Sequence, residues 1–171
     1  NYSCHCGLSN QAYDLKLTAT CAAQINFGLV SQLLDHFNFQ KPIYNQDELE
    51  RRVTKVVKDR NLNLRLAKNP ESWREAIAGV KSENVILMLN SERVDGFDIS
   101  WIWDVDFSKL HSKNIVVAGS RAIDLAYRLE VGGLTAKQAS TIDDAITNFP
   151  INSEIELLAV YTAYYQLAAK L

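Results

Sequence analysis

Residues 94–107 concentrate the side chains best suited to chemistry. Two tryptophans stand there among four aspartates, which are Asp95, Asp98, Asp104 and Asp106. The segment follows an apolar run over residues 84–90 that is typical of a buried strand. Open α/β sheets usually place their chemistry where strands end. The segment is therefore either a functional loop or a solvated loop with two core tryptophans.

The four aspartates differ in what their neighbours allow. Alternation over residues 100–107 predicts an extended segment with Trp101 and Trp103 on one face and Asp104 on the other. Buried tryptophans would hold a carboxylate rigidly enough to orient a histidine ring. Asp98 is either such a group or the cap of a short turn, and Asp95 forms a good turn with the glycine that follows it. Asp98 and Asp104 are the leading candidates for a catalytic aspartate, and Asp95 is the third.

Polar residues also follow a predicted strand at residues 61–67. Lys68 is a candidate contact for a phosphate or a substrate carboxylate, as a point charge. Asn69 before a proline reads as the N-cap of a helix, which makes an exposed lysine at a plain helix start the competing interpretation. We expect Lys68 and Asn69 to bind substrate if the site is functional.

A second strand-to-helix turn occurs at residues 119–121. Backbone N–H groups there could hold an anion, but the pattern is not GxGxxG, so no dinucleotide site is predicted. Arg121, Asp124 and Arg128 follow at spacings of three and four. This pattern is typical of a solvated helix face with weak ion pairs, or of an interface.

Four short motifs in order resemble a known family. They are Lys68-Asn69-Pro70, the DGxDxSWxWDxDF run at residues 95–107, GSRAxDxAxRL at residues 119–129, and Tyr161-Thr162-Ala163. Together they are similar to the C-terminal domain of MurT, the Mur-ligase-like subunit of lipid II isoglutaminyl synthase. The resemblance covers residues 61–171.

The resemblance implies a two-subunit enzyme of peptidoglycan synthesis in the cytoplasm. A glutaminase subunit releases ammonia from glutamine, and the Mur-ligase-like subunit uses ATP and Mg²⁺ to activate the D-glutamate α-carboxylate of lipid II. Ammonia then gives D-isoglutamine. An aspartate of the C-terminal domain is expected to support the Cys-His pair of the glutaminase. Trp101, Trp103 and Arg121 are expected at the interface between the subunits.

The chain departs from the family at two places. It lacks a GxxxxGK[ST] phosphate loop, so we expect this chain to hold no cofactor by itself, with ATP and Mg²⁺ bound elsewhere in the full complex. Cys4, His5 and Cys6 resemble a zinc-ribbon remnant, but Cys-x-Cys is tighter than a zinc knuckle and the second CxxC is missing. We therefore expect no bound metal.

Composition limits the other function classes. A net charge of −2 gives no electrostatic footprint for nucleic acid. No apolar run approaches the length of a transmembrane segment, and no signal peptide is visible. Three cysteines argue against a disulfide framework and favour a reducing cytoplasm.

The hydrophobic pattern predicts an N-terminal appendage over residues 1–41 and a main domain over residues 42–171, divided at Pro42. In the appendage we expect a strand at 11–19 and a helix at 21–37. In the main domain we expect strands at 61–67, 84–90, 114–118 and 154–160, and helices at 46–59, 70–78, 121–130, 141–148 and 162–171. This alternation predicts a Rossmann-like α/β fold, with a mainly parallel sheet and helices on both faces. The competing functional hypothesis is a free-standing α/β binding module without a catalytic role.

Overall fold

The computed structural model describes residues 21–40 and 52–170. Contacts divide the chain into two compact units, Asn1–Arg51 and Arg52–Leu171. The predicted strand at 11–19, the Cys4–Cys6 cluster and the boundary at Pro42 lie outside the described residues.

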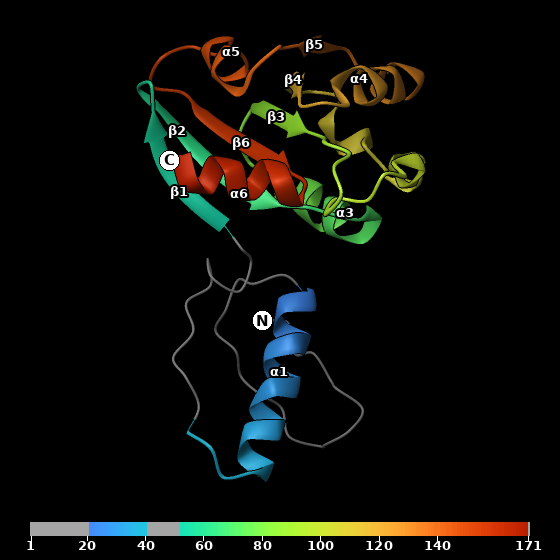
Figure 1. Ribbon diagram of the computed structural model, residues 1–171. Helices are drawn as coiled ribbons and strands as arrows, with labels where there is room; N and C mark the ends of the chain where they lie inside the picture. The colour runs from blue at the N-terminus through green and yellow to red at the C-terminus, as the bar shows by residue number, and fades with distance from the viewer. Residues whose placement is uncertain (1–20, 41–51, 171) are drawn as a thin grey trace. The chain divides into compact units, whose positions relative to one another are not determined.

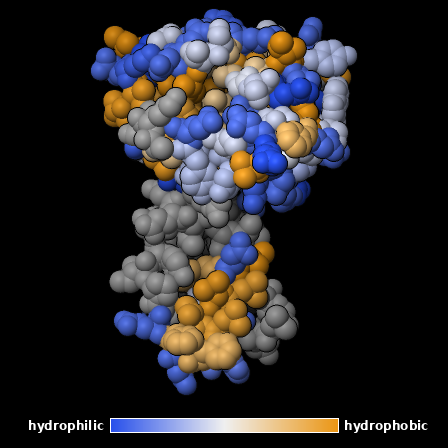
Figure 2. All heavy atoms as spheres, viewed as in Figure 1, coloured by the Kyte–Doolittle hydropathy of each residue, from blue (hydrophilic) through white to orange (hydrophobic). Residues whose placement is uncertain are grey.

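The first unit contains helix α1 (Cys21–His36), which confirms the helix predicted over residues 21–37. Exposed apolar side chains gather on this unit, as Figure 2 shows. They are Ile25, Leu29, Val30, Leu33, Phe37 and Phe39. No helix among the described residues is both long and apolar enough to cross a membrane.

The second unit is built on a six-stranded sheet (Figure 1). The strands are β1 (Arg52–Val57), β2 (Arg60–Leu66), β3 (Asn84–Met88), β4 (Asn114–Ala118), β5 (Ala136–Gln138) and β6 (Glu154–Ala159). Their order across the sheet is β1-β2-β6-β3-β4-β5. Only the β1–β2 pair is antiparallel. The predicted mainly parallel sheet is therefore confirmed.

Helices cover both faces of this sheet, as predicted. They are α3 (Pro70–Ala78), α4 (Ala122–Val131), α5 (Ile142–Thr147) and α6 (Tyr161–Lys170). Arg60 and Arg65 lie five positions apart on β2 and so point to opposite faces. Arg60 donates from Nε and Nη2 to the carbonyl of Phe149 after α5, at 2.8 and 2.7 Å. Arg65 donates from Nη2 to the carbonyl of Gly79 after α3, at 3.4 Å. Consequently α3 and α5 lie on opposite sides of the sheet.

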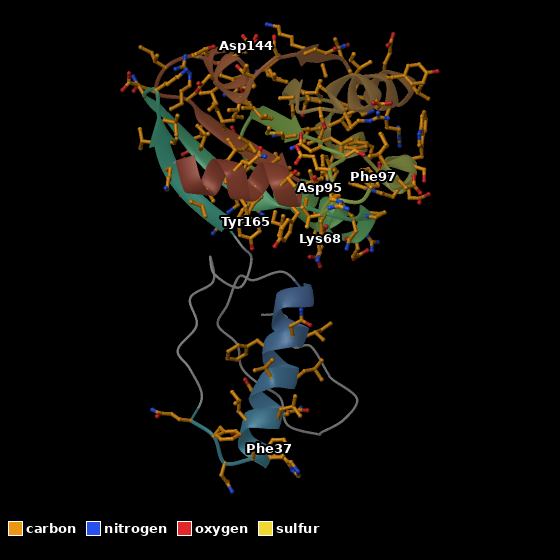
Figure 3. All side chains as sticks on the ribbon, viewed as in Figure 1. Phe37, Lys68, Asp95, Phe97, Asp144 and Tyr165 are labelled. Atoms are coloured by element: carbon orange, nitrogen blue, oxygen red, sulfur yellow. The ribbon has the colours of Figure 1, made fainter. Side chains whose placement is uncertain are left out.

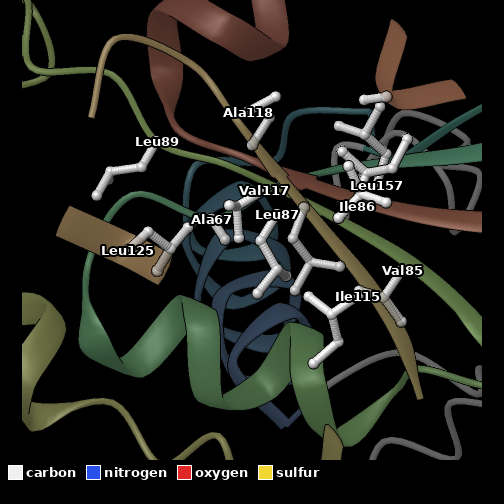
Figure 4. Packing of buried hydrophobic residues seen from close by; sticks show 14 of the residues in the cluster. Ala67, Val85, Ile86, Leu87, Leu89, Ile115, Val117, Ala118, Leu125 and Leu157 are labelled. Carbon is white, nitrogen blue, oxygen red and sulfur yellow. The ribbon is translucent and has the colours of Figure 1, made fainter. Parts of the chain in front are cut away.

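The core lies between the central strands and these helices (Figure 4). Apolar side chains from β2, β3, β4 and β6 have no measurable exposure, as Leu64, Leu87, Val117 and Leu157 illustrate. Burying one such side chain stabilises the fold by roughly 1.5–3 kcal/mol. The core therefore fixes the strand ends to which the candidate site is attached.

The helix predicted over residues 46–59 is wrong where the structure describes it. Residues 52–57 form β1, which pairs with β2 through a tight turn at Lys58 and Asp59. Both turn residues have left-handed φ angles, of 49° and 59°. The β-branched residues Val53, Thr54, Val56 and Val57 favour a strand, but two of the valines also fit a helical spacing.

Other boundaries agree more closely with prediction. Asn69 caps α3 by accepting a hydrogen bond from the Ser72 backbone N–H at 2.9 Å, Pro70 opens the helix, and Gly79 ends it. The short edge strand β5 was not predicted, because its three residues are mostly polar. On α6, Tyr164 is buried in the core, whereas Tyr161 and Tyr165 are exposed.

Candidate functional site

The Asp95 side chain is held by hydrogen bonds at the edge of the sheet where the parallel strands end. Its Oδ1 accepts a hydrogen bond from the Thr162 backbone N–H at 2.8 Å, and its Oδ2 accepts a short one from the Thr162 hydroxyl. The Glu92 backbone N–H also donates to Oδ2, at 3.3 Å. Thr162 lies in the first turn of α6, where backbone N–H groups have no partner within the helix. Asp95 thus ties the loop after β3 to α6.

The same network continues to the next strand. Asn90 donates from Nδ2 to the Thr162 hydroxyl oxygen at 3.0 Å, and its Oδ1 accepts from the Ser120 backbone N–H at 3.0 Å. Gly119 has a φ of +102°, and a Cβ there would lie 2.3 Å from the Leu89 carbonyl oxygen. Glycine is therefore required where the β4 turn approaches the β3 turn. This network joins the ends of β3, β4 and β6.

Residues 100–107 do not form the extended segment that alternation predicted. Ser100–Asp104 is a 3₁₀ helix, η1, followed by the shorter η2 at Ser108–Leu110. In a 3₁₀ helix, residues three apart lie on one side. Ile102 and Val105 are accordingly buried, whereas Trp103 is 49% exposed. The predicted alternation holds only at the end of the segment, where Val105 and Phe107 are buried on either side of the exposed Asp106.

Two aspartates start these short helices in the same way. Asp98 accepts a hydrogen bond from the Ser100 backbone N–H at 2.8 Å, and Asp106 accepts one from the Ser108 backbone N–H at 2.9 Å. These hydrogen bonds, followed by those from the serine hydroxyls, hold the pKa of each carboxyl below its usual value. Both carboxylates are exposed and are ionised at neutral pH.

Asp98 lines a groove that Asp106 does not. The groove has a volume of about 360 Å³ and lies between residues 97–103 and the start of α4. Its remaining lining residues are Phe97, Ile99, Ser100, Ile102, Trp103, Arg121, Asp124 and Tyr127. Figure 3 labels Asp95 and Phe97, which begin this segment, at the end of the domain where the parallel strands end. A carboxylate is thus surrounded by accessible aromatic rings.

The two tryptophans take different places. Trp101 packs inward on the buried Trp73, with ring centroids 6.1 Å apart. Trp103 faces outward against Tyr127, with centroids 6.2 Å apart and rings at 73°. Arg121 forms an ion pair with Asp124, Nε to Oδ2, at 3.0 Å on the groove wall. The structure therefore brings Asp98, Trp103 and Arg121 together, and places Trp101 behind them.

Asp104, Lys68 and Asn69 lie outside the groove lining. Asp104 is an exposed residue at the end of η1. Lys68 is exposed at the end of β2, and Asn69 is occupied by its capping role. The side chains of Asn69 and Ser72 bond each other's backbone, which agrees with the plain helix start considered from the sequence.

The turn before α4 does not fit a phosphate group. None of the described residues form a group of three or more His, Cys, Asp or Glu side chains able to hold a metal ion. At the turn before α4, the Ser120 N–H is used by Asn90 and the Arg121 N–H by the Leu89 carbonyl. These backbone donors are therefore not available to cradle a phosphate.

Sequence reasoning missed Asn90, Thr162 and Arg128 as parts of the site. The sequence pattern placed Arg128 on a solvated helix face or at an interface, whereas its guanidinium contacts residues 102–107 of the same domain. Thr162 belongs to the motif Tyr161-Thr162-Ala163, one of the four that carry the family resemblance, and this motif could have pointed to it. The contact between Asp95 and Thr162 spans 67 positions, so local patterns could not reveal it.

Comparison with solved structures defines the class of fold. UDP-N-acetylmuramate-alanine ligase MurC from Thermotoga maritima superposes with a TM-score of 0.55 and 12% sequence identity. The match covers 91% of this chain and 39% of MurC. The fold is therefore of the kind found in Mur ligases.

The sequence defines the family. The model of the family described as MurT ligase C-terminal matches residues 66–164, and the chain belongs to this family. The MurT subunit of lipid II isoglutaminyl synthase (glutamine-hydrolyzing) from Streptococcus pneumoniae is 29% identical over 150 residues, which is 80% of this chain and 32% of that protein. The Staphylococcus aureus MurT subunit is 37% identical over 75 residues, which is 40% of this chain and 17% of that protein. The chain thus spans about a third or less of these relatives.

Proposed function

We propose that this chain is the C-terminal part of a MurT-like subunit of lipid II isoglutaminyl synthase. The full enzyme would amidate the D-glutamate of the peptidoglycan stem peptide to D-isoglutamine, using ATP and ammonia from glutamine. Family membership over residues 66–164 supports the subunit assignment. A cytoplasmic location and lipid II as the substrate of the complex are parts of this proposal.

Within that enzyme, the domain docks the glutaminase subunit through the groove beside η1. The observation that carries this role is an ionised aspartate set among exposed aromatic side chains. Phe97, Trp103 and Tyr127 are 75%, 49% and 60% exposed. Aromatic residues are enriched at protein–protein interfaces and dominate their binding energy. A glutaminase surface that covers these rings would also meet Asp98.

Asp98 is the aspartate best placed to reach the partner. Asp95 has both carboxylate oxygens engaged by residues of this domain. Asp104 lies outside the groove lining, and so does Asp106. The Ser100 backbone N–H donates to Oδ1 of Asp98 and fixes the carboxylate. A carboxylate can accept several hydrogen bonds, so Asp98 can also accept one from a histidine of the partner. Lys68 and Asn69 are not needed for this step.

Glutamine hydrolysis in the partner depends on a correctly oriented histidine. In a glutaminase that uses a Cys-His pair, the imidazole takes the thiol proton and later gives it to the departing ammonia. A carboxylate that accepts from the other ring N–H holds the correct tautomer and stabilises the imidazolium. Asp98 is thus a positioning residue that acts through the partner's histidine. ATP and Mg²⁺ belong to another part of the full complex.

Binding between the two proteins tests the docking role. Trp103→Ala should weaken association with the cognate glutaminase subunit by about tenfold or more, because truncating a central aromatic anchor typically costs about 2 kcal/mol. Tyr165→Ala is the matched control, since Tyr165 is 46% exposed but lies on α6. Titration calorimetry of the full chain with the purified glutaminase measures both.

The result also separates this proposal from a free-standing binding module. Absence of a complex between the wild-type chain and the glutaminase would favour the module. Equal affinities of wild type and Trp103→Ala would exclude the groove as the docking site.

A further inference from the structure

Arg128 holds the segment that carries the groove. It lies near the end of α4, and its guanidinium contacts η1 and the residues that link η1 to η2. Nε donates to the Ile102 carbonyl at 3.2 Å, and Nη2 donates to the Val105 carbonyl at 2.8 Å. The Ile102 carbonyl also accepts a long hydrogen bond from the Val105 backbone N–H, at 3.4 Å, so Arg128 reinforces the end of η1.

Two aromatic rings flank the same guanidinium. Its Cζ lies 5.3 Å from the Trp103 ring centroid and 5.4 Å from that of Phe107. Cation–π attraction at such distances adds to the two hydrogen bonds. Phe107 in turn packs edge-on against the buried Trp73, with centroids 5.8 Å apart. Arg128 therefore connects an outward ring of the groove to the core of the domain.

The hydrogen bonds of the segment show how much depends on this one side chain. Among the described residues, Arg128 is the side chain from another element that donates hydrogen bonds to the backbone of residues 99–107. Asp98 and Asp106 act only within their own turns. The start of the loop is tied separately, by Asp95 on Thr162. Asp98 thus lies between two fixed points of the segment, Asp95 bonded to Thr162 on one side and the carbonyls bonded by Arg128 on the other.

We propose that Arg128 is a positioning residue that fixes residues 99–107 so that Trp103 and Asp98 are presented together to a protein partner. This inference rests on the proposed function for the identity of that partner, the glutaminase subunit. Lysine cannot replace arginine here, because an ammonium has neither the planar fork for two carbonyls nor the stacking surface for two rings. The positive charge alone is therefore insufficient.

Arg128→Lys tests the inference, with Arg74→Lys as the control. Arg74 pairs with Glu71 on the exposed side of α3, so its replacement should change little. Arg128→Lys should speed amide hydrogen exchange of residues 99–107 by about tenfold or more, because two charge-assisted hydrogen bonds to the backbone of the segment are lost or weakened. Exchange in β3, β4 and β6 should stay at the wild-type rate.

The second readout is association with the glutaminase subunit. Arg128→Lys should raise the Kd of the complex about tenfold, because the partner must then order the segment itself. Turnover of glutamine at saturating partner should keep most of its value, since Asp98 is still present. This split between Kd and kcat is not expected of a substitution that merely lowers global stability.

Either of two results would overturn the inference. Unchanged exchange of residues 99–107 would show that Arg128 does not hold the segment. Faster exchange with an unchanged Kd would show that the order of the segment is irrelevant to docking. The proposed function fails differently, when the wild-type chain forms no complex with the glutaminase.

Discussion

Aspartates of one short segment perform different tasks because their surroundings differ. Asp95 has its oxygens saturated by Thr162 and the Glu92 backbone, so its role is to hold the loop. Asp98 is held only within its own turn, by the backbone N–H and the hydroxyl of Ser100, and it lines the groove. Residue type and sequence position alone do not distinguish these roles. They are distinguished by residues that are distant along the chain, Thr162 of α6 that bonds Asp95 and the residues of α4 that line the groove with Asp98.

Thr162→Val tests the holding role of Asp95. The change removes a hydroxyl that bonds both Asp95 and Asn90, and valine keeps the size of the side chain. We expect a loss of about 1–3 kcal/mol in the free energy of unfolding, the cost of leaving part-buried polar groups without partners. Urea denaturation measures it. Thr54→Val is the control, because the Thr54 hydroxyl bonds Asn63 on an exposed surface. Equal stability of Thr162→Val and wild type would contradict the network.

Glu156 gives the domain a pH dependence that can be separated from other carboxylates. Its side chain is nearly buried beside Arg65, with Nε and Oε2 3.3 Å apart. Burial raises the pKa of Glu156, and the nearby Arg65 charge only partly opposes that effect. The folded state therefore retains the proton to a higher pH than the unfolded state does.

The sign of the effect follows from proton binding. Between the unfolded pKa and the raised folded pKa the native state binds more protons, so stability contributed by the neutral form is lost as pH rises. Wild type should lose stability relative to Glu156→Gln as the pH is raised from about 4.5 to 7. Thermal melts of both proteins at several pH values measure this difference. A difference that stays constant, or that grows in favour of wild type, would contradict the raised pKa.

At the scale of elements, helices and strands were predicted correctly where the hydrophobic pattern or the helix caps fitted one type of element only. The strands β3 and β4 were predicted from continuous apolar runs, and the helix α3 was predicted because Asn69, Pro70 and Gly79 mark its ends. Prediction failed where local chemistry was ambiguous. Valines at 53 and 56 fit a helix as well as a strand, and alternation over residues 100–107 suggested an extended chain that is in fact a 3₁₀ turn.

The turn between β1 and β2 can be improved by substitution. Lys58 and Asp59 both adopt left-handed backbone angles, which cost non-glycine residues energy. Replacing them by the preferred Asn-Gly pair (Lys58→Asn with Asp59→Gly) should stabilise the domain by about 1 kcal/mol. The lost Lys58–Asp143 ion pair is exposed and contributes little. Chemical denaturation tests this, and a clear loss of stability would contradict the turn geometry.

At the scale of the whole molecule, one edge of a parallel sheet collects the polar residues of three strand ends. The mainly parallel sheet could be predicted from the sequence, and so could the position of the segment after β3 at the end of a buried strand. The choice among its aspartates could not, because it depends on contacts with α4 and α6 that lie 23 to 67 positions away. We therefore propose that the groove beside η1 docks the glutaminase subunit and that Asp98 contacts the histidine of that partner.

Glutamate release by the complex of this chain with its cognate glutaminase tests that central claim most directly. Asp98→Asn keeps the size of the side chain and removes its charge, and the account predicts a loss of about a hundredfold or more in glutaminase turnover. Asp106→Asn is the matched control, because Asp106 forms the same turn with Ser108 outside the groove and should retain turnover. Circular dichroism verifies that both variants are folded. Full glutaminase activity in Asp98→Asn, or an equal loss in both variants, would contradict the assignment.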